Sequence, residues 1–194
     1  IVSTNFNDLK KKYAKGIELR GKTLGIIGIG KIGQSVAGYA LGCGMKVVAH
    51  DPYIDNVNIE LNISGTAKVQ VGINTISMDE LLQTSDFISM HIPKQADGSA
   101  VIGSSEFPRM KNGVCIVNAA RGGVIDEKAL IAALDSGKVA HAALDVYENE
   151  PNPMKELLNH SKISLTPHIG AATNEAQERI GVELAERLIE ALAV

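Results

Sequence analysis

The segment Gly28-Ile-Gly-Lys-Ile-Gly33 constrains the fold of this chain more than any other feature. It matches G-x-G-x-x-G, follows a short apolar run at 23–27, and opens a stretch with apolar residues at helical spacing between 32 and 41. A second strand pattern at 46–50 completes a strand, helix, strand unit. In this setting a glycine loop predicts main-chain N–H groups at a helix N-terminus that hold a pyrophosphate.

Each glycine of the loop has a separate task in such a site. Gly28 permits the tight turn, Gly30 lets the pyrophosphate approach the backbone, and Gly33 lets the helix pack close to the strand. Asp51 ends the second strand, where a carboxylate accepts hydrogen bonds from ribose hydroxyls and repels a 2′-phosphate, so NAD is preferred to NADP. The alternative is an ordinary turn with an ordinary strand terminator, and the complete unit with its acid weighs against it.

Composition bounds the class of protein. The chain has 194 residues, of which 45% are hydrophobic and 21% charged, as in one soluble globular domain. It has no 18-residue apolar run, and its 19 basic residues are outnumbered by 22 acidic ones, so neither a membrane span nor a nucleic-acid partner is expected. Cys43 and Cys115 lie far apart without a C-x-x-C motif, which predicts no disulfide scaffold and no metal site. A reducing compartment, the cytoplasm, fits this composition.

The alternation of strand and helix patterns continues along the chain. Strand patterns recur at 87–90, 114–117, 139–146 and 163–165. A capping box at Ser77-x-x-Glu80 and a cap at Asp126 open helices, and an amphipathic helix follows Thr173. The low aromatic content, 4%, favours a core of aliphatic residues. The sequence therefore predicts the α/β class with a doubly wound parallel sheet, with a poorly defined helix and a weak edge strand over Pro52–Thr75.

Three polar residues directly follow predicted strands, at the edge where such a sheet binds ligands. The planar fork of Arg121 suits bidentate capture of a carboxylate, although a surface ion pair is the alternative. His168 is suited to proton exchange near neutrality, and a structural role remains open for it. Glu150 belongs to a group of three acids, any of which could be solvated, and spacing does not say which one points inward.

From about Glu18 onward the chain resembles the D-2-hydroxyacid dehydrogenases, in particular the members that act on D-3-phosphoglycerate. Five segments carry the resemblance: Leu19-Arg-Gly-Lys-Thr-Leu-Gly-Ile-Ile-Gly28, His91-Ile-Pro93, Val117-Asn-Ala-Ala-Arg-Gly-Gly123, Ala143-Leu-Asp-Val-Tyr-Glu-Asn-Glu-Pro151 and Thr166-Pro-His-Ile-Gly170. The resemblance implies NAD as cofactor and hydride transfer from C2 of a hydroxy acid. The loop Lys94-Gln-Ala-Asp-Gly98 departs from the commoner threonine-containing form.

The resemblance also assigns residues. It implies a catalytic set in which Arg121 binds the carboxylate and the C2 oxygen, His168 exchanges the hydroxyl proton, and Glu150 orients His168 and favours its imidazolium form. Together with the glycines of the loop, the implied cofactor contacts are Gly28, Gly30, Lys31, Ile32, Gly33, Asp51, His91, Pro93, Ala119, Arg121, Asp145, His168 and Gly170. Asp145 is expected near the nicotinamide carboxamide.

The family also implies a domain organisation and leaves rival functions open. Residues 1–18 are expected to link from an upstream substrate domain, 19–170 to bind NAD, and 171–194 to form a helix leading back toward the substrate domain. A homodimer through the nucleotide domain is expected. The alternatives are a non-catalytic NAD-sensing module and a dehydrogenase for glycerate or D-lactate. Without its substrate domain the chain is expected to bind NAD and turn over little.

Overall fold

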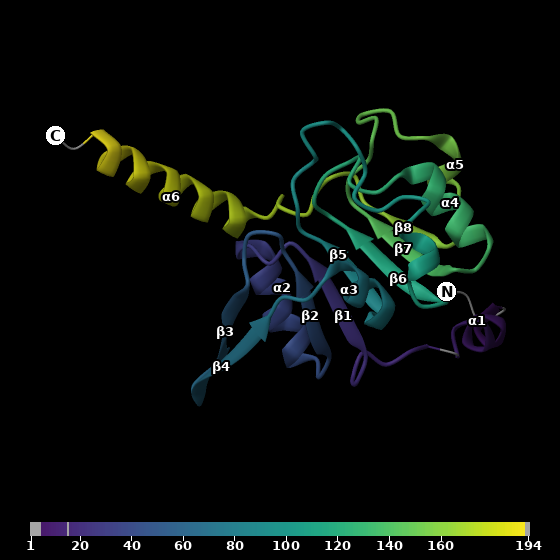
Figure 1. The fold of residues 1–194 in the computed structure, drawn as a ribbon, viewed down its shortest axis with the longest axis horizontal. Coiled ribbons are helices and arrows are strands. Elements are labelled where there is room, and N and C mark those ends of the chain that lie inside the picture. The colour runs from purple at the N-terminus through teal and green to yellow at the C-terminus, as the bar shows by residue number, and fades with distance from the viewer. Residues whose placement is uncertain (1–4, 15, 193–194) are drawn as a thin grey trace.

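The structure is a computed structural model that describes residues 5–14 and 16–192. Strands and helices alternate over most of this length (Figure 1). In chain order the elements are α1 (Phe6–Tyr13), β1 (Thr23–Ile27), α2 (Lys31–Gly42), β2 (Lys46–His50), β3 (Asn56–Ile63), β4 (Ala67–Asn74), α3 (Met78–Thr84), β5 (Phe87–Met90), the 3-10 helix η2 (Phe107–Arg109), β6 (Val114–Asn118), α4 (Glu127–Asp135), β7 (Val139–Leu144), α5 (Lys155–Leu158), β8 (Ile163–Leu165) and α6 (Asn174–Leu192).

The central sheet confirms the predicted class. Six parallel strands lie in the order β2-β1-β5-β6-β7-β8, with helices on both sides. Within this sheet, the chain passes first through β1, then through β2 at the edge, and then crosses to β5 on the other side of β1. This reversal of winding opens a crevice at the carboxyl ends of β1 and β5, which is where a doubly wound sheet binds ligands.

Two apolar clusters hold the sheet between its layers. Successive residues of β1 point to opposite faces, so that Ile26 packs with α2 while Ile27 belongs to the cluster that contains α3 and α4. The predicted caps form: the Ser77 hydroxyl accepts the Glu80 N–H at 3.2 Å, and Asp126 accepts the Ala129 N–H at 3.0 Å. These caps fix where α3 and α4 begin, and with them the loops at the carboxyl edge of the sheet.

The segment after Asp51 is a β-hairpin, so the predicted helix over part of Pro52–Thr75 is wrong. β3 and β4 pair antiparallel around a turn in which Gly65 has φ 71°, and they form a separate two-stranded sheet. The hairpin lies beside α2 and β2 (Figure 1). Ile59 and Ile73 are buried in the cluster that contains α2, whereas most of the alternate residues are exposed. The hairpin therefore covers part of the sheet as a helix would.

The two terminal helices contribute no residue to the buried core. In α1 every residue is at least partly exposed, and α1 lies where the sequence predicts only a connection. α6 projects away from the sheet (Figure 1), and its apolar residues, Ile180 and Leu184 among them, are about half exposed. Residues 1–4, 15, 193 and 194, which the predicted linker and C-terminal helix include, lie outside the described residues. Within the described ranges, no helix has the length and apolar character that crossing a membrane requires.

Candidate cofactor and active site

The loop between β1 and α2 shows which of its glycines the fold itself requires. Gly28 has φ 92°, and a Cβ there would lie 2.5 Å from the carbonyl oxygen of His91. A Cβ at Gly33 would overlap the carbonyl oxygen of Gly28. Gly30 is different, because its φ of -69° suits any residue and no atom lies within 4 Å of a Cβ built there. The space above Gly30, at the N-terminus of α2, fits a pyrophosphate.

A groove of about 610 Å³ runs along this loop to the ends of β2 and β5. It brings together five of the predicted cofactor residues, Gly28, Gly30, Asp51, His91 and Pro93. The carboxylate of Asp51 accepts the Ile29 N–H at 3.0 Å and the Tyr53 N–H at 2.9 Å, so its orientation is fixed at the groove. Each of its oxygens keeps a lone pair, which leaves the carboxylate able to accept from a ribose hydroxyl.

His91 adds no charge to the groove. Burial lowers the pKa of its imidazole, and Nε2 lies 2.8 Å from the Ser89 hydroxyl. The other two residues predicted here stand at the start of α2: Ile32 is 70% exposed, and Lys31 forms an ion pair at 3.5 Å with Glu183 of α6. Neither lines the groove.

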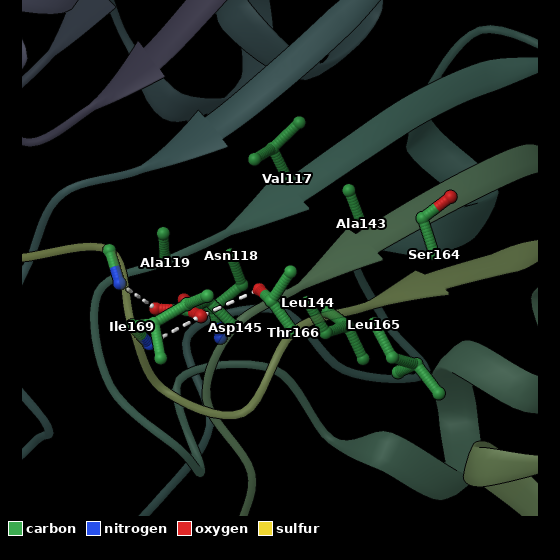
Figure 2. Close-up of a pocket in the computed structure, with 11 residues that line it drawn as sticks. Val117, Asn118, Ala119, Ala143, Leu144, Asp145, Ser164, Leu165, Thr166 and Ile169 are labelled. Carbon is green, nitrogen blue, oxygen red and sulfur yellow. Dashed lines mark hydrogen bonds between the residues drawn. The ribbon is translucent and has the colours of Figure 1, made fainter. Parts of the chain in front are cut away.

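Asp145 organises a second pocket, of about 350 Å³, at the carboxyl ends of β6, β7 and β8 (Figure 2). Its Oδ1 accepts the Thr166 hydroxyl at 2.6 Å and the Ile169 N–H at 2.8 Å, and its Oδ2 accepts the Gly170 N–H at 2.8 Å. Burial would raise the pKa of Asp145, but these hydrogen bonds outweigh it and lower the pKa below its ordinary value. The predicted contacts Ala119 and Gly170 line the same pocket.

The Asp145→Asn variant is expected to lose about 1–3 kcal/mol of stability at neutral pH, because the new amide presents a donor where Asp145 accepts a main-chain N–H. The lowered pKa stabilises the fold above the ordinary value of 3.8, and this contribution is lost as the pH falls toward the folded-state pKa. Urea unfolding of both proteins at neutral and acidic pH measures the effect. Equal stability of the two proteins at neutral pH would contradict it.

Glu150 and His168 are in direct contact. The Nδ1 of His168 lies 2.8 Å from Oε2 of Glu150, whose Oε1 accepts the Tyr147 N–H at 2.9 Å. The hydrogen bonds from His168 and from the Tyr147 N–H lower the pKa of Glu150, so this carboxylate stays ionised. Since a carboxylate only accepts, Nδ1 carries a proton, and Nε2 of neutral His168 is left with a lone pair. Of Asp145, Glu148 and Glu150, it is Glu150 that forms the hydrogen bond with His168.

The backbone at His168 is unusual. Among the described residues it is the only non-glycine residue with a positive φ, 55°. The left-handed region costs free energy for a residue with a Cβ, and such residues gather at functional sites. Glu150 and His168 line a pocket of about 420 Å³ whose other walls include Pro151, Pro153 and Leu165.

Arg121 follows β6 on a turn built by Asn118. The Asn118 side chain donates to the Arg121 carbonyl and accepts the Ala120 N–H, both at 3.0 Å. The exposed guanidinium donates to the Ala120 carbonyl at 2.6 Å, and in this structure it contacts neither Glu150 nor His168. The three candidate catalytic residues therefore share one edge of the sheet, at the ends of β6, β7 and β8, but only two of them touch.

Sequence reasoning overlooked the residues that hold this edge in shape. Asn118 is buried at the end of β6, Thr166 anchors Asp145, and the Tyr147 hydroxyl donates to the carbonyls of Thr166 at 2.6 Å and Leu144 at 3.2 Å. Asn118 and Thr166 could have been found from the sequence, because each is a polar residue at the end of an apolar strand. Over the described ranges, no group of three or more His, Cys, Asp or Glu side chains is placed to hold a metal ion.

Comparison with known proteins identifies relatives of similar sequence and fold. Residues 3–170 match the family described as D-isomer specific 2-hydroxyacid dehydrogenase, NAD binding domain. A D-3-phosphoglycerate dehydrogenase of Arabidopsis thaliana is 47% identical over 185 residues, which are 94% of this chain and 30% of that protein. A hydroxypyruvate reductase of Thermotoga maritima is 43% identical over 196 residues, which cover all of this chain and 60% of that protein.

A solved structure has the same fold. The glyoxylate reductase from Paecilomyes thermophila superposes with a TM-score of 0.77 at 39% identity, over 95% of this chain and 55% of that one. The chain thus spans between about a third and three fifths of these relatives. The glycine loop, the oriented Asp51 and the matching relatives lead to one conclusion: the chain belongs to the D-isomer-specific 2-hydroxyacid dehydrogenases and contains their NAD-binding domain.

Proposed function

We propose that this chain supplies the cofactor-binding and proton-transferring half of an NAD-dependent dehydrogenase that acts on a D-2-hydroxy acid, with D-3-phosphoglycerate as substrate. The single observation that carries the proposal is the 2.8 Å hydrogen bond between Glu150 and His168 at the carboxyl edge of the sheet. A histidine oriented by a carboxylate is the arrangement that general acid-base catalysis uses. The names of the phosphoglycerate dehydrogenase relatives support the substrate.

In the proposed reaction NAD, when bound, would accept the hydride that leaves C2 of the substrate. The guanidinium of Arg121 binds the substrate carboxylate through paired N–H donors. To do so, it must first release its hydrogen bond to the Ala120 carbonyl. Nε2 of His168 accepts the proton of the C2 hydroxyl, and Nδ1–H remains bonded to Glu150. The ionised Glu150 stabilises the imidazolium that results.

A panel of D-2-hydroxy acids tests the substrate. With the complete protein and NAD, D-3-phosphoglycerate is expected to give a kcat/KM at least about tenfold above those of D-glycerate and D-lactate, because a distal phosphate adds charge-assisted hydrogen bonds. NADH formation measures the rates. Binding of NADH without turnover of any acid in the panel would favour a non-catalytic NAD-sensing module instead.

A second substrate has specific support. The Thermotoga maritima relative is named a hydroxypyruvate reductase, and the match covers twice as large a share of that protein as of the Arabidopsis thaliana one, 60% against 30%. Hydroxypyruvate is the oxo acid of glycerate, so this candidate keeps the same histidine, glutamate and arginine and drops only the phosphate. A higher kcat/KM for glycerate than for its phosphate ester would select it.

We further propose the setting of the activity. The proposed division is a linker (1–18), an NAD-binding domain (19–170) and a helix toward the substrate domain (171–194). The family match over 3–170 supports the boundary at residue 170, whereas it includes most of the proposed linker. A homodimer through the nucleotide domain, a cytoplasmic location and a place in serine synthesis follow from the resemblance to phosphoglycerate dehydrogenases. The isolated chain is proposed to bind NAD with little turnover, since a single cleft wall neither excludes water nor holds both reactants.

A further inference from the structure

A buried carboxylic acid outside the proposed catalytic set lies next to the segment that carries Glu150. Glu127, in the first turn of α4, is only 4% exposed. Its Oε1 accepts the Glu148 N–H at 2.7 Å, and in return the Glu148 side chain accepts the Glu127 N–H at 3.2 Å. Two reciprocal hydrogen bonds thus tie the start of α4 to the segment after β7.

The tied segment is the one that presents Glu150. Tyr147, next to Glu148, donates its N–H to Glu150, which holds His168. The other side of the segment is fixed as well, because a Cβ at Gly122 would overlap the Tyr147 carbonyl. Movement of Glu148 away from α4 would therefore be transmitted within two residues to the carboxylate that orients the histidine.

We propose that Glu127 is a positioning residue of this dehydrogenase, which fixes Glu150 and through it His168 by holding the Glu148 main chain. The inference rests on the proposed function. Loss of Glu127 would leave a main-chain N–H without its acceptor and would free the 147–150 segment. Small displacements of reacting groups lower turnover steeply, by up to about 100-fold for a shift of about 1 Å.

The task of Glu127 requires one acceptor, its Oε1. Burial raises the pKa of Glu127 and the negative charges of Glu148 and Asp126 add to this effect, although the hydrogen bond from the Glu148 N–H lowers the pKa. Among the described residues, Oε2 of Glu127 is the only buried side-chain oxygen or nitrogen without a hydrogen-bond partner. An unpartnered carboxylate oxygen is costly to bury, whereas an uncharged group costs much less. Glutamine keeps an Oε1 that can accept the Glu148 N–H, and it should therefore replace Glu127.

The experiment compares E127A and E127Q in the complete protein, with the substrate that the panel selects. E127A is expected to lower kcat about tenfold while the Kd for NADH changes less than about twofold, because Glu127 lines none of the cofactor pockets. E127Q is expected to keep kcat within about twofold of the parent. In E127A the pH dependence of kcat should also change, since a displaced Glu150 no longer stabilises the imidazolium that forms on His168.

Asp86→Ala is the matched control. The Asp86 carboxylate also accepts a main-chain N–H, that of Thr23 at 2.8 Å, but at the amino ends of the strands. D86A should lower the Tm and leave kcat and its pH profile unchanged. If E127A loses stability like D86A but keeps the parent kcat and pH profile, the proposal is wrong.

A folding failure of E127A would not end the test. Glu148→Ala removes only the reciprocal bond from an exposed side chain, and it is expected to lower kcat about threefold. An unchanged kcat in E148A, with E127A unfolded, would overturn the proposal. The proposed function fails separately: if replacing His168 leaves turnover intact, the dehydrogenase mechanism is wrong whatever Glu127 does.

Discussion

Replacing His168 by asparagine is expected to lower kcat by about 10²–10⁴-fold, because the general acid-base is removed. Asparagine is the appropriate replacement for a structural reason. It tolerates the left-handed backbone that His168 adopts, φ 55°, so the turn after β8 should keep its shape. NADH affinity should change little, since Asp51 and the glycine loop are untouched. Steady-state rates of 2-oxo acid reduction by the complete protein measure the loss.

His160→Asn provides the control for the His168 variant. His160 is also a histidine in contact with a carboxylate, with Nε2 3.3 Å from Asp135, but its partner lies at the end of α4. This variant removes a histidine–carboxylate contact without touching the proposed site, and kcat should stay near the parent value. Turnover by H168N equal to that of H160N would refute the assignment of the proton-transferring group.

The Gly30→Val variant is expected to weaken NADH binding by about 100-fold or more and to leave the Tm unchanged. That factor corresponds to about 2.8 kcal/mol of binding free energy. The fold has room for the new side chain, since no atom lies within 4 Å of a Cβ at Gly30 and its φ is ordinary. The side chain would instead occupy the space where the pyrophosphate approaches the N-terminus of α2. The chain has no tryptophan, so NADH fluorescence reports binding with little interference from the protein.

Two other glycines make the Gly30 result interpretable. Gly42, at the far end of α2, also has open space around a Cβ, so G42V should retain both stability and NADH affinity. Gly33 packs against the Gly28 carbonyl, and G33A should lower the Tm before any ligand is added. Parent-like NADH affinity in G30V would mean that the dinucleotide does not cross this loop.

The parallel sheet could be predicted because its strands are short aliphatic runs bounded by turn residues. Five of the six were located to within a residue, and the sixth, β7, ends at Leu144 although a strand was predicted to Val146. Val146 is still buried, so the apolar pattern extends beyond the end of the strand. Burial follows from side-chain chemistry, whereas strand ends depend on hydrogen bonding that the pattern does not encode.

The hairpin could have been predicted from a signal that was present. Residues 57–63 and 67–73 largely alternate apolar with polar side chains or glycine, and Ser64-Gly-Thr66 separates them. That is the signature of a hairpin rather than of a crossover helix. The Asn and Gly residues of Pro52–Thr75 favour a poorly defined helix only if this period is ignored, whereas in the structure they belong to two paired strands and a turn.

The candidate site was only partly predictable for a different reason. Asp51 directly follows β2, and Glu150 and His168 lie on the segments that follow β7 and β8, so their position on one edge follows from the topology. Which of Asp145, Glu148 and Glu150 forms the hydrogen bond with His168 depends on the course of an irregular segment. That course is set by Gly122 and Glu127, which contact Tyr147 and Glu148 from an earlier part of the sequence. Contacts of this kind are tertiary and leave no local pattern.

The β3–β4 hairpin also determines which backbone groups are open to other chains. β2 is an edge strand of the six-stranded sheet. The Ile76 N–H donates to the Ala49 carbonyl at 2.8 Å, so the carboxyl-terminal part of this edge is already hydrogen-bonded within the chain. The β3–β4 hairpin carries Glu60 and Lys68 on its exposed surface, where the two side chains form an ion pair at 3.1 Å. Charged side chains beside unpaired strands discourage intermolecular pairing. Substitutions of these two residues are therefore expected to cause precipitation during expression, whereas the NADH affinity of the protein that stays in solution should be unchanged.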